Sequence, residues 1–371
     1  MDERINFFVG LDVHKDSISI AVCDGSSREA ARFAGNIGTD VQQLMKVLAK
    51  GGEPSQVSVV YEAGPTGYGL YRELCRRGYH CEIVAPSLIP RRPGEHIKND
   101  RRDCLRLAEL SRSGELKAIW VPDAAHEAVR DLCRAREDAV QMRLKARQQL
   151  KAFLLRHDRH FPGKTSWTKT HERWIAEQKF EQAGENIALT EYHLAAQAAE
   201  ERVQRLTTAL LEIVKGWRFE SVIAALRSLR GIDSVSAIGL IAEVGDFSRF
   251  NSPRDLMGYL GLVPSEHSSG NSVRRGSITK AGNSHARRLL TEAAWNYRFP
   301  ARLSGPLRER SRGLPEVVRN HAWKAQLRLT SRFAKLAARK VHINKVCVAV
   351  ARELAGFVWA IARLAQPATA T

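Results

Sequence analysis

Cysteines are few in this sequence, and none of them belongs to a paired motif. Six are spread over 371 residues without a CxxC spacing, which argues against zinc-binding and disulfide-rich classes and indicates a reducing compartment. Long apolar runs are also missing, because Arg352 and Glu353 interrupt residues 346–362. That stretch is too short and too charged to span a bilayer. The first residues are polar and acidic, unlike a signal peptide, so we expect a soluble, cytoplasmic protein with no membrane partner.

Acidic residues are scarce in the last part of the chain. Residues 271–371 contain 20 lysines and arginines against 4 aspartates and glutamates, and so carry +16 of the total net charge of +18. A short basic run is usually a solvated helix face. A stretch of this length with so few acids instead favours contact with phosphates. We therefore expect DNA, or another nucleic acid, as the partner.

The chain is long enough for two or three domains. Residues 1–122 show three antiparallel strands followed by strands separated by helices, a pattern that predicts an α/β sheet covered by helices. Residues 123–217 are dense in charge and poor in glycine, and they predict two long helices that form an antiparallel hairpin or a coiled coil pairing subunits. Residues 218–371 regain glycine and proline punctuation and are predicted to be mostly helical.

Acidic residues stand at the ends of two predicted strands and at the start of a predicted helix. Asp12 and Glu62 each close an apolar strand, while Asp100 and Asp103 share one face of the helix. Four converging carboxylates could hold two Mg²⁺ ions, or Mn²⁺ as a substitute, as in-line phosphodiester chemistry requires. Each acid alone also has an ordinary explanation, as a turn residue, a helix cap or a favourable first-turn charge.

Two sets of motifs, one in each half of the chain, resemble the DEDD transposases of insertion sequences. The first set is Gly-Leu-Asp-Val-His-Lys from Gly10, Glu-Ala-Gly-Pro-Thr-Gly-Tyr from Glu62, and Lys-Asn-Asp-Arg-Arg-Asp from Lys98. The second set is Leu-Arg-Gly-Ile-Asp-Ser-Val from Leu229, Gly-Leu-Val-Pro from Gly261, His-Ser-Ser-Gly from His267, and Ile-Thr-Lys-Ala-Gly-Asn from Ile278. The resemblance covers about residues 5–125 and 225–345. Cys104 stands where the family usually has alanine, and Ala286 where leucine is common.

This family includes a pilin-gene invertase and bridge-RNA-guided recombinases. The resemblance implies a ribonuclease H-like, resolvase-like catalytic domain over residues 1–122, a helical coiled-coil linker over 123–217 and a mostly α-helical transposase domain over 218–371. It also implies Mg²⁺-dependent cleavage and rejoining of DNA, a homo-oligomer (a dimer or tetramer), and an element-encoded guide RNA as an additional partner to test for.

The resemblance further implies a serine nucleophile in the second half. The matching residue is Ser269, beside Gly270, although the neighbouring Ser268 leaves the position open by one residue. A hydroxyl next to glycine in a polar loop can approach a phosphate closely, but Ser-Ser-Gly more commonly makes local hydrogen bonds. Basic residues around this loop are expected to contact phosphates. They are Arg274, Arg275, Lys280, Arg287 and Arg288.

Other conspicuous residues have ordinary structural explanations. His14 and Lys15, beside Asp12, are interpreted as structural residues rather than ligands. Trp295, Trp323 and Trp359 lie in helical patterns and are predicted to belong to the core.

Two other functions remain open from the sequence. In a hydrolytic, resolvase-like nuclease, water would attack the phosphate and Ser269 would be idle. A non-enzymatic nucleic-acid-binding scaffold would have a decayed site, and the presence of all four acids argues against it. A covalent protein–DNA adduct would distinguish the recombinase from the nuclease.

Overall fold

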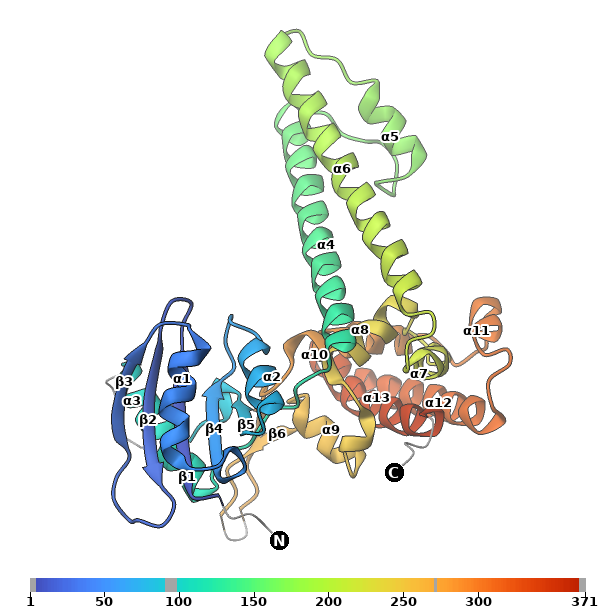
Figure 1. Ribbon diagram of the computed structural model, residues 1–371. Coiled ribbons are helices and arrows are strands. Elements are labelled where there is room, and N and C mark those ends of the chain that lie inside the picture. The colour runs from blue at the N-terminus through green and yellow to red at the C-terminus, as the bar shows by residue number, and fades with distance from the viewer. Residues whose placement is uncertain (1–4, 91–98, 270–271, 367–371) are drawn as a thin grey trace. The chain divides into compact units, whose positions relative to one another are not determined.

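The computed structural model describes residues 5–90, 99–269 and 272–366 of the chain (Figure 1). The chain divides into two compact units, Met1–Val121 and Pro122–Thr371.

The amino-terminal unit is built on one mixed β-sheet. Its strands are β1 (Phe7–Val13), β2 (Ile18–Asp24), β3 (Arg32–Ile37), β4 (Val57–Glu62) and β5 (His80–Val84), in the order β3-β2-β1-β4-β5. The first three pair antiparallel, whereas β4 runs parallel to β1 and β5 parallel to β4. The predicted α/β organisation of this region is confirmed.

Helices cover both faces of this sheet. The helices α1 (Val41–Leu48) and α2 (Gly69–Arg76) bury leucines against Val9 and Leu11 of β1. The opposite face carries α3 (Asp100–Ser113), which packs on small residues such as Ala21. Because side chains alternate along a strand, every second residue of β1 faces α3.

The second unit begins with two long helices and a short one between them. These are α4 (Ala124–Arg156), α5 (Lys169–Ala176) and α6 (Ala183–Ile213). Arg147 of α4 bonds Glu200 at 2.8 Å, and Arg136, three turns earlier, bonds Thr207 further along α6 at 2.7 Å. Partners that advance in opposite directions require antiparallel helices, as Figure 1 also shows. The sequence predicted two long helices in this region and did not predict the short helix α5.

The rest of this unit is mostly helical, as predicted. Its helices are α7 (Glu220–Leu226), α8 (Ser234–Val244), α9 (Pro253–Tyr259), α10 (Ser284–Ala294), α11 (Gly305–Arg310), α12 (Glu316–Ala338) and α13 (Ile343–Ala365). A two-stranded hairpin, β6 (Pro264–Glu266) and β7 (Arg275–Ile278), interrupts them. Short 3-10 turns lie at Ala49–Gly51, Pro54–Gln56, Pro86–Leu88, Phe247–Arg249 and Trp295–Arg298.

The apolar helix α13 forms the centre of this helical core. It packs against α7, α9, α10 and α12, and residues such as Val350 and Leu354 are fully buried. Burial inside the protein explains the apolar character of residues 346–362. No helix in the described part of the chain is long and apolar enough to cross a bilayer.

Candidate active site

Asp12 and Glu62 lie at the same edge of the sheet, on neighbouring strands. Leu11 of β1 pairs with Tyr61 of β4 in parallel register. Asp12 and Glu62 are the next residues on the two strands, so they lie side by side. Gly10 faces α3, and Asp12, two residues on, therefore faces the same side. Val60 packs with Leu107 of α3, which places Glu62 on that side as well.

The amino end of α3 brings Asp100 to this edge. Asn99 is the cap of the helix, because its side chain accepts a 2.9 Å hydrogen bond from the amide of Arg102. Asp100 is therefore not the capping residue, the ordinary role that its position suggested. Its carboxylate lies 3.5 Å from Nε2 of His14, and that same nitrogen lies 3.3 Å from the carboxylate of Asp12.

The charges at this edge are crowded. Burial raises the pKa of Asp12, and the nearby negative charges of Asp100 and Asp103 raise it further, although His14 opposes this. Carboxylates that disfavour one another's ionisation are a suitable environment for a hard divalent cation, which takes carboxylate oxygens as ligands. The donor set at this edge therefore fits a Mg²⁺ or Mn²⁺ ion.

His14 belongs to this cluster, which the sequence interpretation missed. Ligand atoms of Asp12, His14 and Asp100 all lie within 4.8 Å of one another. The available signal was the spacing Asp-x-His at the end of a strand, because residues two apart face the same side.

Ser269 lies near the tip of the β6–β7 hairpin. Its backbone exchanges two 3.1 Å hydrogen bonds with Ser272, and its side chain is exposed. Gly270, which featured in the sequence argument, lies outside the described residues. The hydroxyl of Ser268 donates to Glu266 at 2.8 Å and accepts from the amide of Arg274 at 3.2 Å. No hydrogen bond of the Ser269 hydroxyl occurs within the described part of the chain.

The five basic residues expected to bind phosphate fall into two groups. Arg274, Arg275 and Lys280 are exposed at the hairpin or beside it, and Arg275 of β7 lies 3.5 Å from the carboxylate of Glu266. Arg287 instead donates to the carbonyl of Leu260 at 2.9 Å. Arg288 pairs with Glu137 at 2.9 Å and with Glu292 at 2.8 Å. The structure thus gives Arg275, Arg287 and Arg288 partners inside their own unit, and of the five residues only Arg287 and Arg288 are partly buried.

A polar cluster around one buried carboxylate lies next to the base of the hairpin. Asn283 caps α10 and donates to Glu243, a residue only 2% exposed, at 2.6 Å. Arg134 of α4 donates to the same carboxylate at 3.0 Å. Burial alone would raise the pKa of Glu243, but the hydrogen bonds from Arg134 and Asn283 bring it below its usual range. The cluster joins α4, α8 and the segment that leads out of β7.

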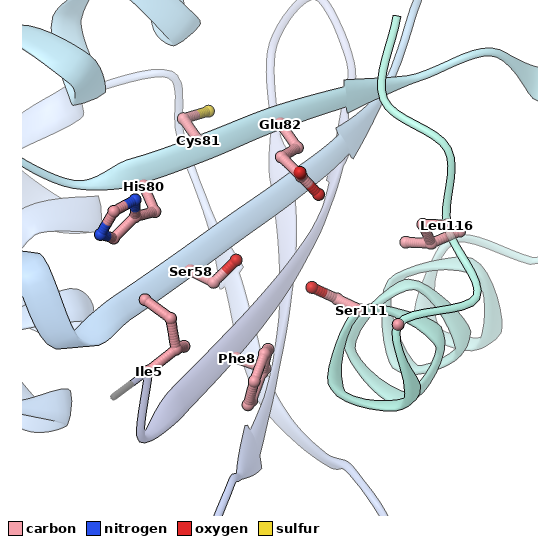
Figure 2. A pocket seen from close by; sticks show the side chains of 9 residues that line it. Ile5, Phe8, Ser58, His80, Cys81, Glu82, Ser111 and Leu116 are labelled. Carbon is pink, nitrogen blue, oxygen red and sulfur yellow. The ribbon is translucent and has the colours of Figure 1, made fainter. Parts of the chain in front are cut away.

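A separate cavity of about 580 Å³ lies at the other end of the sheet. Figure 2 shows Ser58, Glu82 and Ser111 around it, between β4, β5 and the end of α3. Ser58 precedes Glu62 by four residues of extended strand, about 13 Å. This cavity is therefore distinct from the acidic edge.

Two family models match the chain. The DEDD transposase model of the IS110 group, described as a transposase, matches residues 9–158, and the model described as Transposase IS116/IS110/IS902 family matches residues 223–303. The chain belongs to this family of insertion-sequence transposases. The first match contains all four acids, and the second contains Ser268, Ser269 and the five basic residues.

Individual relatives of the chain are also named as transposases. The transposase is 47% identical over 365 residues to "Putative transposase y4qE" of Sinorhizobium fredii, covering 98% of this chain and 90% of the relative. It is 33% identical to the "Transposase for insertion sequence element IS1533" of Leptospira borgpetersenii, covering 91% and 99% respectively. The chain is thus an enzyme of DNA transposition, which confirms the resemblance seen in its motifs.

Proposed function

We propose that this transposase cleaves and rejoins DNA strands at a divalent-metal site on the edge of its sheet. The observation that carries the proposal is the convergence of Asp12, His14 and Asp100 within 4.8 Å, with Glu62 at the same strand edge. Asp103, close enough to affect the pKa of Asp12, completes the predicted tetrad. We also propose that this unit is a ribonuclease H-like fold, which the strand order and the mixed pairing support.

Asp12, Glu62, Asp100 and Asp103 would hold Mg²⁺ or Mn²⁺, and His14 would add a nitrogen ligand. Bound ions of this kind activate a nucleophile and neutralise the leaving oxygen in phosphoryl transfer. Asp12 is fixed by its strand and largely shielded, with 18% of its side chain exposed. Asp100 is exposed, at 61%, so a phosphate can reach its carboxylate from solvent.

Ser269 is the proposed nucleophile. Its hydroxyl oxygen would attack the scissile phosphorus, a phosphoserine bond would form, and the bond from phosphorus to one sugar oxygen would break. The serine proton leaves to a base, and the departing sugar oxygen gains a proton. Attack by another sugar hydroxyl reverses the exchange, so the number of phosphate ester bonds is conserved and no ATP is needed. The engagement of Ser268 in local hydrogen bonds favours Ser269.

The alternative is hydrolysis, in which water attacks the phosphate at the same metal site. Carboxylates and metal are sufficient for that reaction, and the first family model is itself of the DEDD type. Attack by the serine hydroxyl is therefore the step that distinguishes strand rejoining from hydrolysis.

Three further parts of the proposal concern organisation and partners. We propose the boundaries 1–122, 123–217 and 218–371 as catalytic, hairpin and transposase regions. We propose a homo-oligomer, because exposed apolar side chains such as Leu144, Ile187 and Leu194 lie along the helical hairpin. A guide RNA is proposed as a partner on the basis of the basic charge of the last hundred residues.

The test is metal-dependent strand cleavage with the full-length protein and DNA that carries the element ends. Asp12→Asn should abolish cleavage and weaken Mn²⁺ binding, measured by calorimetry, while DNA binding persists. Asp16→Asn is the matched control, because Asp16 is an exposed acid in the turn that follows β1, four residues after Asp12. Near-normal cleavage by Asp12→Asn would refute the metal site.

A further inference from the structure

A cavity of about 590 Å³ lies between α11 and α12, away from the serine hairpin in sequence. Its volume is within the range of about 300–1,000 Å³ typical of small-molecule sites. We propose that it binds an unstacked base, with the adjoining phosphate, from a single-stranded segment of nucleic acid. This inference rests on the proposed action on DNA but assigns a different site and a different form of nucleic acid.

An exposed indole provides the surface on which a base can stack. Trp323 lines the cavity and is 37% exposed, so the sequence prediction that it belongs to the core is wrong. Leu303, 47% exposed, lines the same cavity. An exposed aromatic ring costs solvation free energy unless it is covered in use, and bases stack on such rings regardless of sequence.

The charges around Trp323 suit phosphate. Arg308 and Arg319 line the cavity and are exposed. Neither guanidinium has an ion pair with any residue that the structure describes. Arg312 pairs with Glu309 at 2.9 Å, which leaves two arginines for the ligand. Glu316 is the acid in the lining, so the balance of the lining is positive.

Two more exposed aromatic side chains lie shortly before Leu303, which lines this cavity. Trp295 and Phe299 are 40% and 52% exposed, and the guanidinium of Arg298 lies 5.0 Å and 4.3 Å from their ring centroids. Trp295 was also predicted to be in the core, and that prediction is wrong as well. Only Trp359 matches its prediction, being packed against the core with its ring nitrogen bonded to the carbonyl of Phe250.

The segment between the two groups is fixed. Arg230 donates to the carbonyls of Phe299 and Pro300 at 3.0 Å, and the amide of Arg302 donates to Gln326 of α12 at 3.2 Å. From Phe299 to Leu303 the chain spans at most about 14 Å, which a few nucleotides can cover. Alternating aromatic and arginine side chains over this distance are typical of single-strand binding.

A second copy of the chain is the other occupant to consider. Positive linings would face one another in a symmetric contact and repel. The charge therefore favours a polyanion, and self-association becomes an outcome of the test.

The experiment measures fluorescence anisotropy of labelled fifteen-nucleotide oligo-dT, oligo-rU and a duplex with the full-length protein. Trp323→Ala should weaken single-strand binding at least about 5-fold, and Trp323→Phe should restore most of it. Arg319→Ala should weaken it too and lower the salt slope by about one. Arg339→Ala is the matched control, because Arg339 is an exposed arginine at the carboxyl end of α12, outside the cavity lining, and has no ion pair with any residue that the structure describes. Duplex affinity should be unchanged by Trp323→Ala.

The oligonucleotide whose affinity falls more in Trp323→Ala identifies the ligand of the cavity. A larger loss for oligo-dT indicates a displaced DNA strand, and a larger loss for oligo-rU indicates an RNA. Equal loss for duplex and single strands, or no loss at all, would overturn the proposal. A change in sedimentation coefficient without a change in single-strand affinity would instead assign the surface to self-association. Metal-dependent cleavage is measured in parallel, so that a protein that fails to cleave but shows the Trp323 effect refutes the proposed function alone.

Discussion

Gly10 of β1 lies directly against the backbone of Cys104 in α3. A methyl group at Gly10 would stand 2.2 Å from the carbonyl oxygen of Cys104 and 2.5 Å from the amide nitrogen of Ala108. Only a residue without a side chain permits this approach. The contact fixes the first turns of α3 over β1, and thereby brings Asp100 and Asp103 to Asp12.

Gly10→Ala should therefore damage both the fold and the metal site. Backbone atoms cannot yield as a flexible side chain can, so we expect a loss of about 1–3 kcal/mol in the free energy of unfolding and weaker Mn²⁺ binding. Urea unfolding and calorimetry measure the two effects. Gly38→Ala is the control, because a methyl group there meets nothing within 4 Å. Equal stability of the two variants would contradict this account of α3 packing.

The amino-terminal site was largely predictable because its acids follow buried strands. Asp12 and Glu62 come directly after apolar runs, and parallel strands bring such residues to one edge. The register shift of β3 opposite Ile20 and Ala21 was not predictable, because it depends on the pairing of β3 with β2. Local patterns do not record such pairings.

The carboxy-terminal unit was harder to predict, because contacts distant in sequence decide its details. Helical periodicity places Trp295 and Trp323 on a face but does not say whether another element covers that face. The short strands of the serine hairpin have no apolar run, and their pairing depends on the turn between them. Arg287 was predicted to bind phosphate, but it donates instead to the carbonyl of Leu260, the residue that follows α9.

His14→Ala should weaken divalent-ion binding without disturbing the fold. The imidazole nitrogen lies within 3.5 Å of both Asp12 and Asp100, and imidazole suits Mn²⁺ better than Mg²⁺. We expect affinity for Mn²⁺ to fall at least about 10-fold, with a smaller fall for Mg²⁺. Loss of nitrogen coupling in the Mn²⁺ spin-echo spectrum would report the missing ligand directly. His80→Ala is the control, because His80 is exposed in the same unit and lines the other cavity. An unchanged spectrum in His14→Ala would exclude His14 as a ligand.

Glu243→Gln should destabilise the carboxy-terminal unit in a pH-dependent way. Because Arg134 and Asn283 hold the pKa of Glu243 below its ordinary value of 4.5, the charged carboxylate stabilises the fold at neutral pH. That contribution is lost as pH falls through the lowered pKa. The variant should lose about 1–3 kcal/mol at pH 7, and the difference from the original protein should shrink in acid.

Urea unfolding at neutral and acidic pH checks this. Glu212→Gln serves as control, since Glu212 is 69% exposed and pairs with Lys215 on the surface. It should change stability by less than about 0.5 kcal/mol. A constant difference for Glu243→Gln across pH would show that the carboxylate charge is not what matters.

DNA binding should weaken steeply with salt, and exposed cations at the hairpin should account for part of the slope. Removing a phosphate contact lowers the salt slope by about one, so Arg274→Ala and Lys280→Ala should each do so. Arg288→Ala should change the slope less, because Arg288 already pairs with Glu137 and Glu292. Point variants are preferable to removal of residues 271–371, which would delete helices that form the core. Salt-independent binding by the unaltered protein would refute the electrostatic account.

Ser269→Ala should abolish the covalent adduct while folding, DNA binding and Mn²⁺ binding are retained. A serine hydroxyl is almost fully protonated at neutral pH and is a poor nucleophile until a base or metal activates it. Ser269 is exposed, and within the described residues its hydroxyl makes no hydrogen bond that would have to break first. Ser268 differs, because its hydroxyl bonds both Glu266 and the amide of Arg274. Ser268→Ala should therefore loosen the hairpin and slow the reaction without removing the adduct.

The two variants separate the nucleophile from its neighbour. Labelled DNA is trapped on the protein with denaturant under conditions of active cleavage, and the modified peptide is mapped by mass spectrometry. An adduct at Ser268 would move the assignment by one residue and would mean that its two hydrogen bonds are given up when DNA binds. Cleavage without an adduct at any serine would establish water as the attacking group, because a serine pathway must pass through a protein-linked phosphate. In that case Ser269→Ala would cleave at nearly the normal rate, whereas Asp12→Asn would remain inactive.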